Sequence, residues 1–265
     1  MPRLGTMPAE IKIDPTEGFP HLPKAPVVEA AVDIRARAEL PWEEKAIAEQ
    51  LKERLPEYPV TLAQQAFQQH FQFGPNQPPQ GSYQELGLKG FRLQSADNLH
   101  IVQFNRDGFV CSRLAPYESW ERFSSELFRL WDVYVELAGP SQIHRLGLRF
   151  INRIRLSPEH QDLRYYLVVP PLTAPELHFP FVAFLHQETF AIPRLPYFVN
   201  IVKTIQLQQD LSVVEPALIL DIDVSSEQPF ALEDGILKDR LSEMRWLKNK
   251  FFFGNITTEA VESFK

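Results

Sequence analysis

Hydrophobic and polar residues alternate strictly between Arg145 and Leu156, which is the pattern of a β-strand. The apolar residues that share one face of this run are Leu146, Leu148, Phe150, Ile154 and Leu156. The opposite face carries four arginines, Arg145, Arg149, Arg153 and Arg155, which we call the arginine ladder. Because side chains alternate across a strand, the ladder is predicted to have rungs roughly 6.6–7 Å apart.

Similar patterns predict the remaining elements. Alternation with period two predicts strands at 28–39, 91–95, 99–104, 109–114, 181–192, 197–208 and 217–224. Apolar stripes at helical spacing predict helices at 41–55, 117–137 and 232–251, a short helix near 162–167 and another after Thr257. Residues 63–73 are ambiguous between helix and strand, and 74–90, rich in Pro, Gly, Asn and Gln, is predicted to be a loop.

This order of elements favours an α+β fold, with a largely antiparallel sheet and packed helices. Pro41, Pro116 and Pro229 each follow a strand and introduce a helix, which suggests two strand–helix halves of one plan whose relatedness the sequence leaves open. We expect an extended Pro-rich lead-in at 1–26, a first α+β half at 27–156, a connector at 157–180 and a second α+β half at 181–265. Together these parts are expected to form one compact unit.

Composition narrows the class of protein. The chain has 265 residues, 44% of them hydrophobic, which is typical of a globular protein with an ample core. Its net charge of −7 excludes a bulk attraction to nucleic acid or anionic membranes, although a local basic patch can still attract phosphate. A single cysteine, Cys111, excludes an intramolecular disulfide and fits a reducing compartment. With no signal peptide and no membrane-length apolar run, we expect a cytoplasmic protein that has no membrane partner.

Most catalytic signatures are absent from the sequence. It has no phosphate-binding loop, no dinucleotide-binding glycine motif, no nucleophile elbow and no zinc-type histidine spacing. Cys111 lies in mid-strand and is expected to be a buried, inert thiol. We therefore expect no catalytic residue and no cofactor, and the sequence leans against an enzyme without deciding the question.

Asp221 and Asp223 share the polar face of the strand at 217–224. Two carboxylates one pleat apart can hold a divalent metal ion, or they can pair with arginines of a neighbouring strand. The second interpretation is favoured, because no third acid or lysine completes a metal set at a recognisable spacing.

The arginine ladder, together with Arg113, supplies the candidate anion-binding residues. Either the ladder is neutralised by carboxylates of the same sheet face, or it binds an anion, a nucleotide or a nucleic acid. The carboxylates available nearby favour a structural charge network. We expect Arg149 and Arg153 to pair with Asp221 and Asp223, and Arg145 and Arg155 to be left free.

Several short runs, in order along nearly the whole chain, carry a resemblance. They are 22–26 (LPKAP), 112–114 (SRL) with Tyr117, Trp120 and Phe123, 149–154 (RFINRI), 220–223 (LDID), and Phe252 with 256–259 (ITTE). On these runs the chain resembles a sporadically distributed prokaryotic family of uncharacterised proteins of about this length. Trp246 departs from it, since the family carries a more polar residue there. The resemblance implies no activity, but a patchy distribution suggests defence or other genetic-conflict systems.

The function expected from the sequence is that of a non-enzymatic cytoplasmic binding or adaptor protein, within such a defence or genetic-conflict system. Its partner is expected to be an unidentified protein or a second copy of the chain. The alternative is a phosphate-directed protein, either a nucleotide or nucleic-acid binder or a metal-dependent nuclease, that uses the arginine ladder with Asp221 and Asp223.

Overall fold

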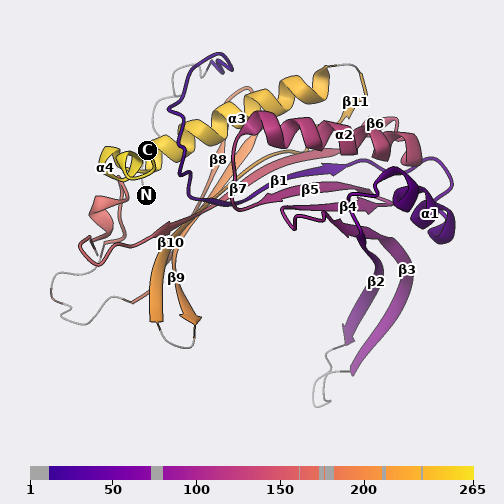
Figure 1. The fold of residues 1–265 in the computed structure, drawn as a ribbon, viewed down its shortest axis with the longest axis horizontal. Coiled ribbons are helices and arrows are strands. Elements are labelled where there is room, and N and C mark those ends of the chain that lie inside the picture. Colours follow the sequence, from indigo (N-terminus) through magenta and orange to yellow (C-terminus); the bar gives the residue numbers. More distant parts are fainter. Residues whose placement is uncertain are drawn as a thin grey trace.

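Nine strands form one antiparallel sheet in the computed structural model of this protein, and helices cover one of its faces (Figure 1). The structure describes residues 12–72, 80–160, 162–172, 176, 182–210, 213–233 and 235–265. The strand order is β2-β3-β4-β5-β1-β7-β10-β9-β8. The strands are β1 (Val27–Arg35), β2 (Val60–Gln72), β3 (Gln80–Gln94), β4 (His100–Asn105), β5 (Gly108–Leu114), β7 (Arg145–Arg155), β8 (Leu185–Ala191), β9 (Phe198–Asp210) and β10 (Val213–Ser226). The expected α+β fold with a largely antiparallel sheet is confirmed.

Two long helices, α2 (Trp120–Ala138) and α3 (Ile236–Asn255), lie across the covered face of the sheet (Figure 1). The smaller elements are α1 (Glu44–Arg54), the 3-10 turn η1 (Leu163–Tyr165), α4 (Thr258–Glu262) and a two-stranded ladder of β6 (Gln142–Ile143) with β11 (Phe230–Ala231). Helix α2 begins where the Ser119 hydroxyl accepts a hydrogen bond from the Arg122 amide, and it ends at Gly139, whose φ of 57° suits glycine. Its predicted apolar stripe is buried from Phe123 to Tyr134.

The two halves of the sheet have similar connectivity. Strand β1 is followed by α1 and the four-stranded meander β2-β3-β4-β5, whose last strand pairs with β1 and leads into α2. Strand β7 is followed by the meander β8-β9-β10, which returns to pair with β7 and leads into α3. Because β1 and β7 pair with each other, the sheet continues without a break from one half to the other.

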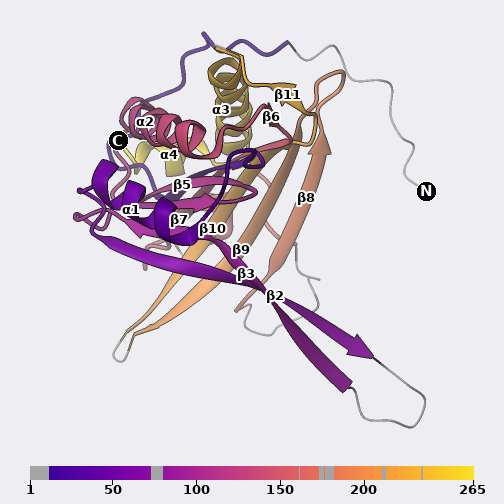
Figure 2. The same ribbon diagram turned by 90° about the vertical axis from the view of Figure 1, so that its right-hand side faces the viewer.

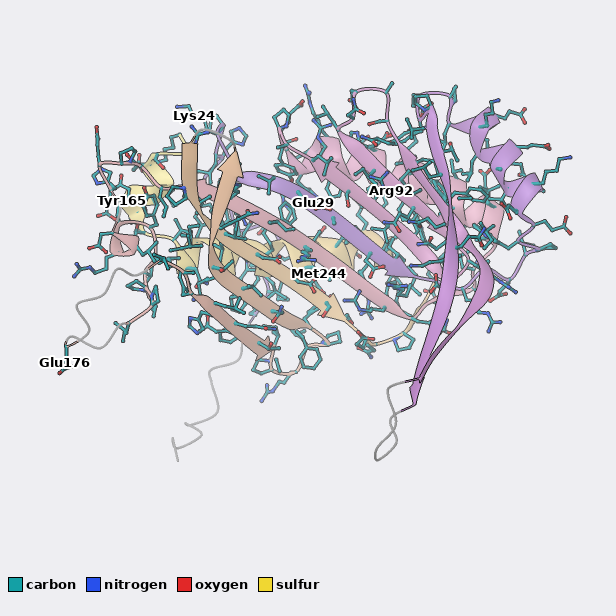
Figure 3. The ribbon with its side chains drawn as sticks, turned by 90° about the horizontal axis from the view of Figure 1, so that it is seen from below. Lys24, Glu29, Arg92, Tyr165, Glu176 and Met244 are labelled. Carbon is teal, nitrogen blue, oxygen red and sulfur yellow. The ribbon has the colours of Figure 1, made fainter. Side chains whose placement is uncertain are left out.

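The core lies between the sheet and the helices. Leu146, Leu148 and Phe150 of β7 are at most 1% exposed, as the alternation predicts. The opposite face is open: none of the helices that the structure describes covers it, and Figure 3 shows Glu29 and Arg92 on this side. The hairpins β2-β3 and β9-β10 project from the open side and diverge from one another (Figure 2). We call this side the open face.

The predicted loop at 74–90 is wrong in its second part, because residues 80–90 belong to strand β3. Polar residues and glycines together occupy more than half of the positions in these glutamine-rich strands, so hydrophobic alternation could not reveal them. The pairing of β2 with β3 is also interrupted by two shifts in register. Gly90 allows a close approach, because a Cβ atom there would lie 2.2 Å from the Phe104 carbonyl oxygen.

Candidate functional site

The arginine ladder lies on the open face, where carboxylates meet it. Arg145 donates to Asp33 at 2.7 Å and to Glu227 at 3.0 Å. The expectation that Arg145 and Arg155 are left free is therefore wrong for Arg145, and Arg155 is also engaged in an interaction. The sequence underestimated the anions because Glu227 comes from beyond the end of β10, outside any alternating strand.

Arg149 pairs with Asp221, as expected. Its Nη2 lies 2.5 Å from Asp221 Oδ2, and its Nε lies 2.9 Å from Oδ1, so the contact is bidentate. The pair is diagonal, because Asp223 is the residue in register with Arg149. Burial raises the pKa of the Asp223 carboxyl above its usual value, although Arg145 and Arg149 act in the opposite direction. Arg153 is also engaged in an interaction.

Arg113, the fifth anion-binding candidate, lies on the helix-covered face instead. It is 7% exposed, and its Nη2 donates to the Pro116 carbonyl oxygen at 3.1 Å and lies 3.5 Å from Glu118 Oε1. It lines a small cavity of about 220 Å³ together with His100 and Arg122. The structure thus separates Arg113 from the arginine ladder.

The next features are the candidate metal ligands and the single cysteine. Within the described ranges, no three or more His, Cys, Asp or Glu side chains converge as a metal site. His178 lies outside the described residues. Cys111 is fully buried, and burial raises the pKa of its thiol.

A larger cavity, of about 460 Å³, opens on the helix-covered side. Its walls come from four parts of the chain: residues 15–27 up to the start of β1, the start of α2 with the residues before it, strand β7, and α3 from Ser242 to Phe253. In Figure 1 the indigo segment ahead of β1 passes across α3. The aromatic residues that line the cavity are Phe19, Tyr117, Trp120, Phe150, Trp246, Phe252 and Phe253. We call it the α2–α3 cavity.

Lys248 is the cation at the floor of the α2–α3 cavity. Its Nζ lies 4.2 Å from the centroid of the Phe150 ring. The described residues place no carboxylate oxygen within ion-pairing distance of this nitrogen. Removal from water lowers the pKa of Lys248 to about 7, and the positive charge of Arg245 acts in the same direction.

Lys203, which is buried, shows how different the half-buried Lys248 is. Lys203 of β9 also points to the covered face and is 2% exposed. Its Nζ lies 2.9 Å from Glu188 Oε2 and donates to Asn255 Oδ1 at 3.1 Å. Burial of a charge is tolerated there because the charge is paired and hydrogen-bonded. Lys248 has no comparable protein partner in the described part of the chain, so it remains available to a ligand.

The segment ahead of β1 is fastened over the cavity by side chains; we call residues 15–26 the strap. Glu17 accepts hydrogen bonds from Trp246 Nε1 at 2.7 Å and from Lys250 Nζ at 2.5 Å. Phe19 stacks on Phe253 with ring centroids 5.6 Å apart. The strap therefore closes one side of the cavity through contacts to α3.

Reasoning from the sequence missed this site, although two signals for it were present. Asn152 is the one polar residue in the apolar series of β7, and it is buried beside the cavity, where its Nδ2 donates to the Leu220 carbonyl oxygen at 2.9 Å. Lys248 falls between Met244 and Phe252 at helical spacing, on the buried stripe of α3. A polar residue in an apolar series is a candidate site residue because its burial needs a reason.

Comparison with models of known protein families gives no match, and no curated protein sequence matches the chain. Among the helices that the structure describes, none has both the length and the apolarity that crossing a membrane requires.

Proposed function

We propose that this chain is a non-enzymatic cytoplasmic binding protein, and that the α2–α3 cavity is where it takes up a small amphipathic ligand. One observation carries the proposal: an aromatic cavity of about 460 Å³ contains a lysine, Lys248, that no carboxylate of the described residues neutralises. Ligand sites are typically concave and mostly apolar, with few polar groups and a volume of about 300–1,000 Å³. From the resemblance to a sporadically distributed family, we assign this binding protein to a defence or genetic-conflict system as part of the same proposal.

The phosphate-directed alternative has weaker support. A phosphate at the ladder would have to displace Asp221 from its bidentate contact with Arg149, or Asp33 and Glu227 from Arg145. An arginine that is already paired contributes less to the binding of a new anion, because the existing ion pair must first be broken. The open face therefore favours internal charge pairing over phosphate capture.

The test uses a neutral ligand and a variant that fills the cavity. Ser242 lines the cavity and donates only to the Lys238 carbonyl oxygen within its own helix. We expect 4-phenylbutanamide to bind the wild type with one-to-one stoichiometry, and to be followed by the fluorescence of Trp120 and Trp246 in the cavity wall. Ser242→Phe should abolish this binding, whereas Ser242→Ala, the matched control, should retain it.

Circular dichroism would establish that both variants fold. Equal binding by Ser242→Phe, or no binding by the wild type, would contradict the assignment of the cavity. A defined hydrolytic activity that is lost on Asp221→Asn would contradict the non-enzymatic part of the proposal.

A further inference from the structure

The charges around the α2–α3 cavity are unevenly matched. Three carboxylates line it, and each already has a cation. Glu17 is paired with Lys250, and Glu118 is paired with Arg122 and lies 3.5 Å from Arg113. Glu121 lies 3.5 Å from Arg245. All three carboxylates are therefore neutralised by other cations. Among the described residues that line the cavity, Lys248 is a cation with no carboxylate partner.

Arg245, the other cation of the wall, is already engaged. Its guanidinium is paired with Glu121 and lies 5.6 Å from the centroid of the Trp120 ring. A ligand anion at Lys248 therefore meets one unmatched positive charge rather than two. A monoanion neutralises this charge, whereas a dianion would leave one negative charge without a partner in the cavity wall.

The aromatic walls of the cavity determine which uncharged group the ligand carries beside its anionic group. Tyr117 meets the Phe150 ring edge-on, with ring centroids 5.6 Å apart, and Phe150 is also the ring beneath Lys248 Nζ. Phe19 and Phe253 are stacked on the strap side of the same cavity. Aromatic walls bind an apolar, and especially an aromatic, body through dispersion and edge-to-face contacts.

We propose that the ligand of the α2–α3 cavity is a monoanionic carboxylate with an apolar body, and that its carboxylate forms an ion pair with Lys248 while its body lies against the aromatic walls. This inference rests on the proposed function, because it names the class of ligand that the same cavity takes up. A charge-assisted contact of this kind is stronger than a neutral hydrogen bond, especially where water is excluded.

The experiment compares three probes of one shape: 4-phenylbutanoate, its neutral amide and the corresponding phenylpropylphosphonate. Titration calorimetry at pH 6.5 should show the carboxylate binding at least about tenfold more tightly than the amide, since a hydrogen bond between charged groups is stronger than one between neutral groups. The phosphonate is mostly a monoanion at this pH and becomes a dianion near pH 8, so its affinity relative to the carboxylate should fall between pH 6.5 and pH 8.

Substitutions in α3 test whether Lys248 causes the preference for the carboxylate over the amide. Lys248→Met should remove the preference for carboxylate over amide while it retains amide binding, because methionine keeps the apolar stem. Lys248→Arg should keep the preference in part. Lys238→Met is the matched control: it removes the same charge from an exposed position of the same helix, outside the cavity, and should leave the preference unchanged.

The outcomes separate this inference from the function on which it rests. Equal affinities for the carboxylate and the amide in the wild type would overturn the inference and leave the cavity a binding site. A preference that survives Lys248→Met would also overturn it. Binding of none of the three probes would overturn the proposed function as well. Tightest binding of the phosphonate would replace the carboxylate with a phosphate-type ligand.

Discussion

Lys248 Nζ, on α3, lies 4.2 Å from the centroid of the Phe150 ring, on β7. The contact joins a helix of the covered face to the strand whose other face carries the arginine ladder. One strand thus presents an aromatic ring to an unmatched cation on one side and arginines to carboxylates on the other. The predictions below follow from this difference between unmatched and matched charge.

Replacement of Lys248 by methionine should stabilise the protein at low pH. The pKa of Lys248 in the folded protein is about 7, below its ordinary value of 10.5, so the unfolded chain binds more protons between these values. The loss of folding stability caused by the charge of Lys248 is therefore complete below pH 7, and it disappears as the pH rises toward 10.5. We expect Lys248→Met to raise the free energy of unfolding by about 1–3 kcal/mol at pH 6, and by less at pH 10.

Urea denaturation of both proteins at the two pH values measures this difference. The control, Lys238→Met, should change the stability little, since Lys238 is exposed. A Lys248→Met protein less stable than wild type at pH 6 would mean that the charge of Lys248 contributes to folding.

Binding of a carboxylate should be accompanied by uptake of a proton at alkaline pH. The ligand's negative charge raises the pKa of Lys248 above its value of about 7, so an amine that is mostly neutral at pH 8 becomes protonated in the complex. We expect uptake of most of one proton per ligand at pH 8 and little at pH 6. Calorimetry in buffers of different ionisation enthalpy measures the uptake. Lys248→Arg, whose side chain is always charged, should show none; uptake that persists in this variant would assign the proton to another group.

Removal of Glu17 should speed the release of ligand. Glu17 fastens the strap to Trp246 and Lys250, and solvent screens these exposed contacts, so they hold the strap only weakly. Glu17→Ala should therefore increase the dissociation rate roughly three- to tenfold, as measured by stopped-flow fluorescence. Glu262→Ala removes a similar ion pair, with Lys265, away from the cavity and serves as the control. Equal rates in all three proteins would show that the strap does not limit release.

The pair of Arg149 with Asp221 should contribute modestly to stability and nothing to the cavity. Arg149 is 52% exposed, so solvent screens the interaction. A double-mutant cycle with Arg149→Ala and Asp221→Ala should give a coupling of about 0.5–1 kcal/mol that decreases with salt. Both variants should bind 4-phenylbutanoate as the wild type does. Tighter binding of a phosphate-rich probe by Asp221→Ala, with a steep salt dependence, would instead support the phosphate-directed alternative.

The sequence predicted the elements whose hydrophobic pattern is regular. The alternation of β7 and the stripe of α2 from Phe123 to Tyr134 were sufficient to place their buried faces. Residues 63–73 of the β2-β3 hairpin stayed ambiguous and 80–90 were predicted as a loop, because these segments are rich in glutamine and glycine. The pairing of Arg145 was missed because Glu227 lies beyond the alternating part of β10. The α2–α3 cavity could not be predicted, because it forms where four segments distant in sequence meet. Only Asn152 and Lys248, polar residues in apolar series, marked it in advance.

The similar connectivity of the two halves has a consequence at their outer ends. Where the chain enters β7, β6 pairs with β11, which precedes α3, so this end is tied by backbone hydrogen bonds. Where the chain enters β1, main-chain hydrogen bonds hold Lys24 and Pro26, and the strap contacts α3 through the side chains of Glu17 and Phe19. The two ends are therefore unequal: the one at β7 is joined by its main chain to the segment before α3, whereas the one at β1 contacts α3 itself through side chains, on the side where the α2–α3 cavity lies.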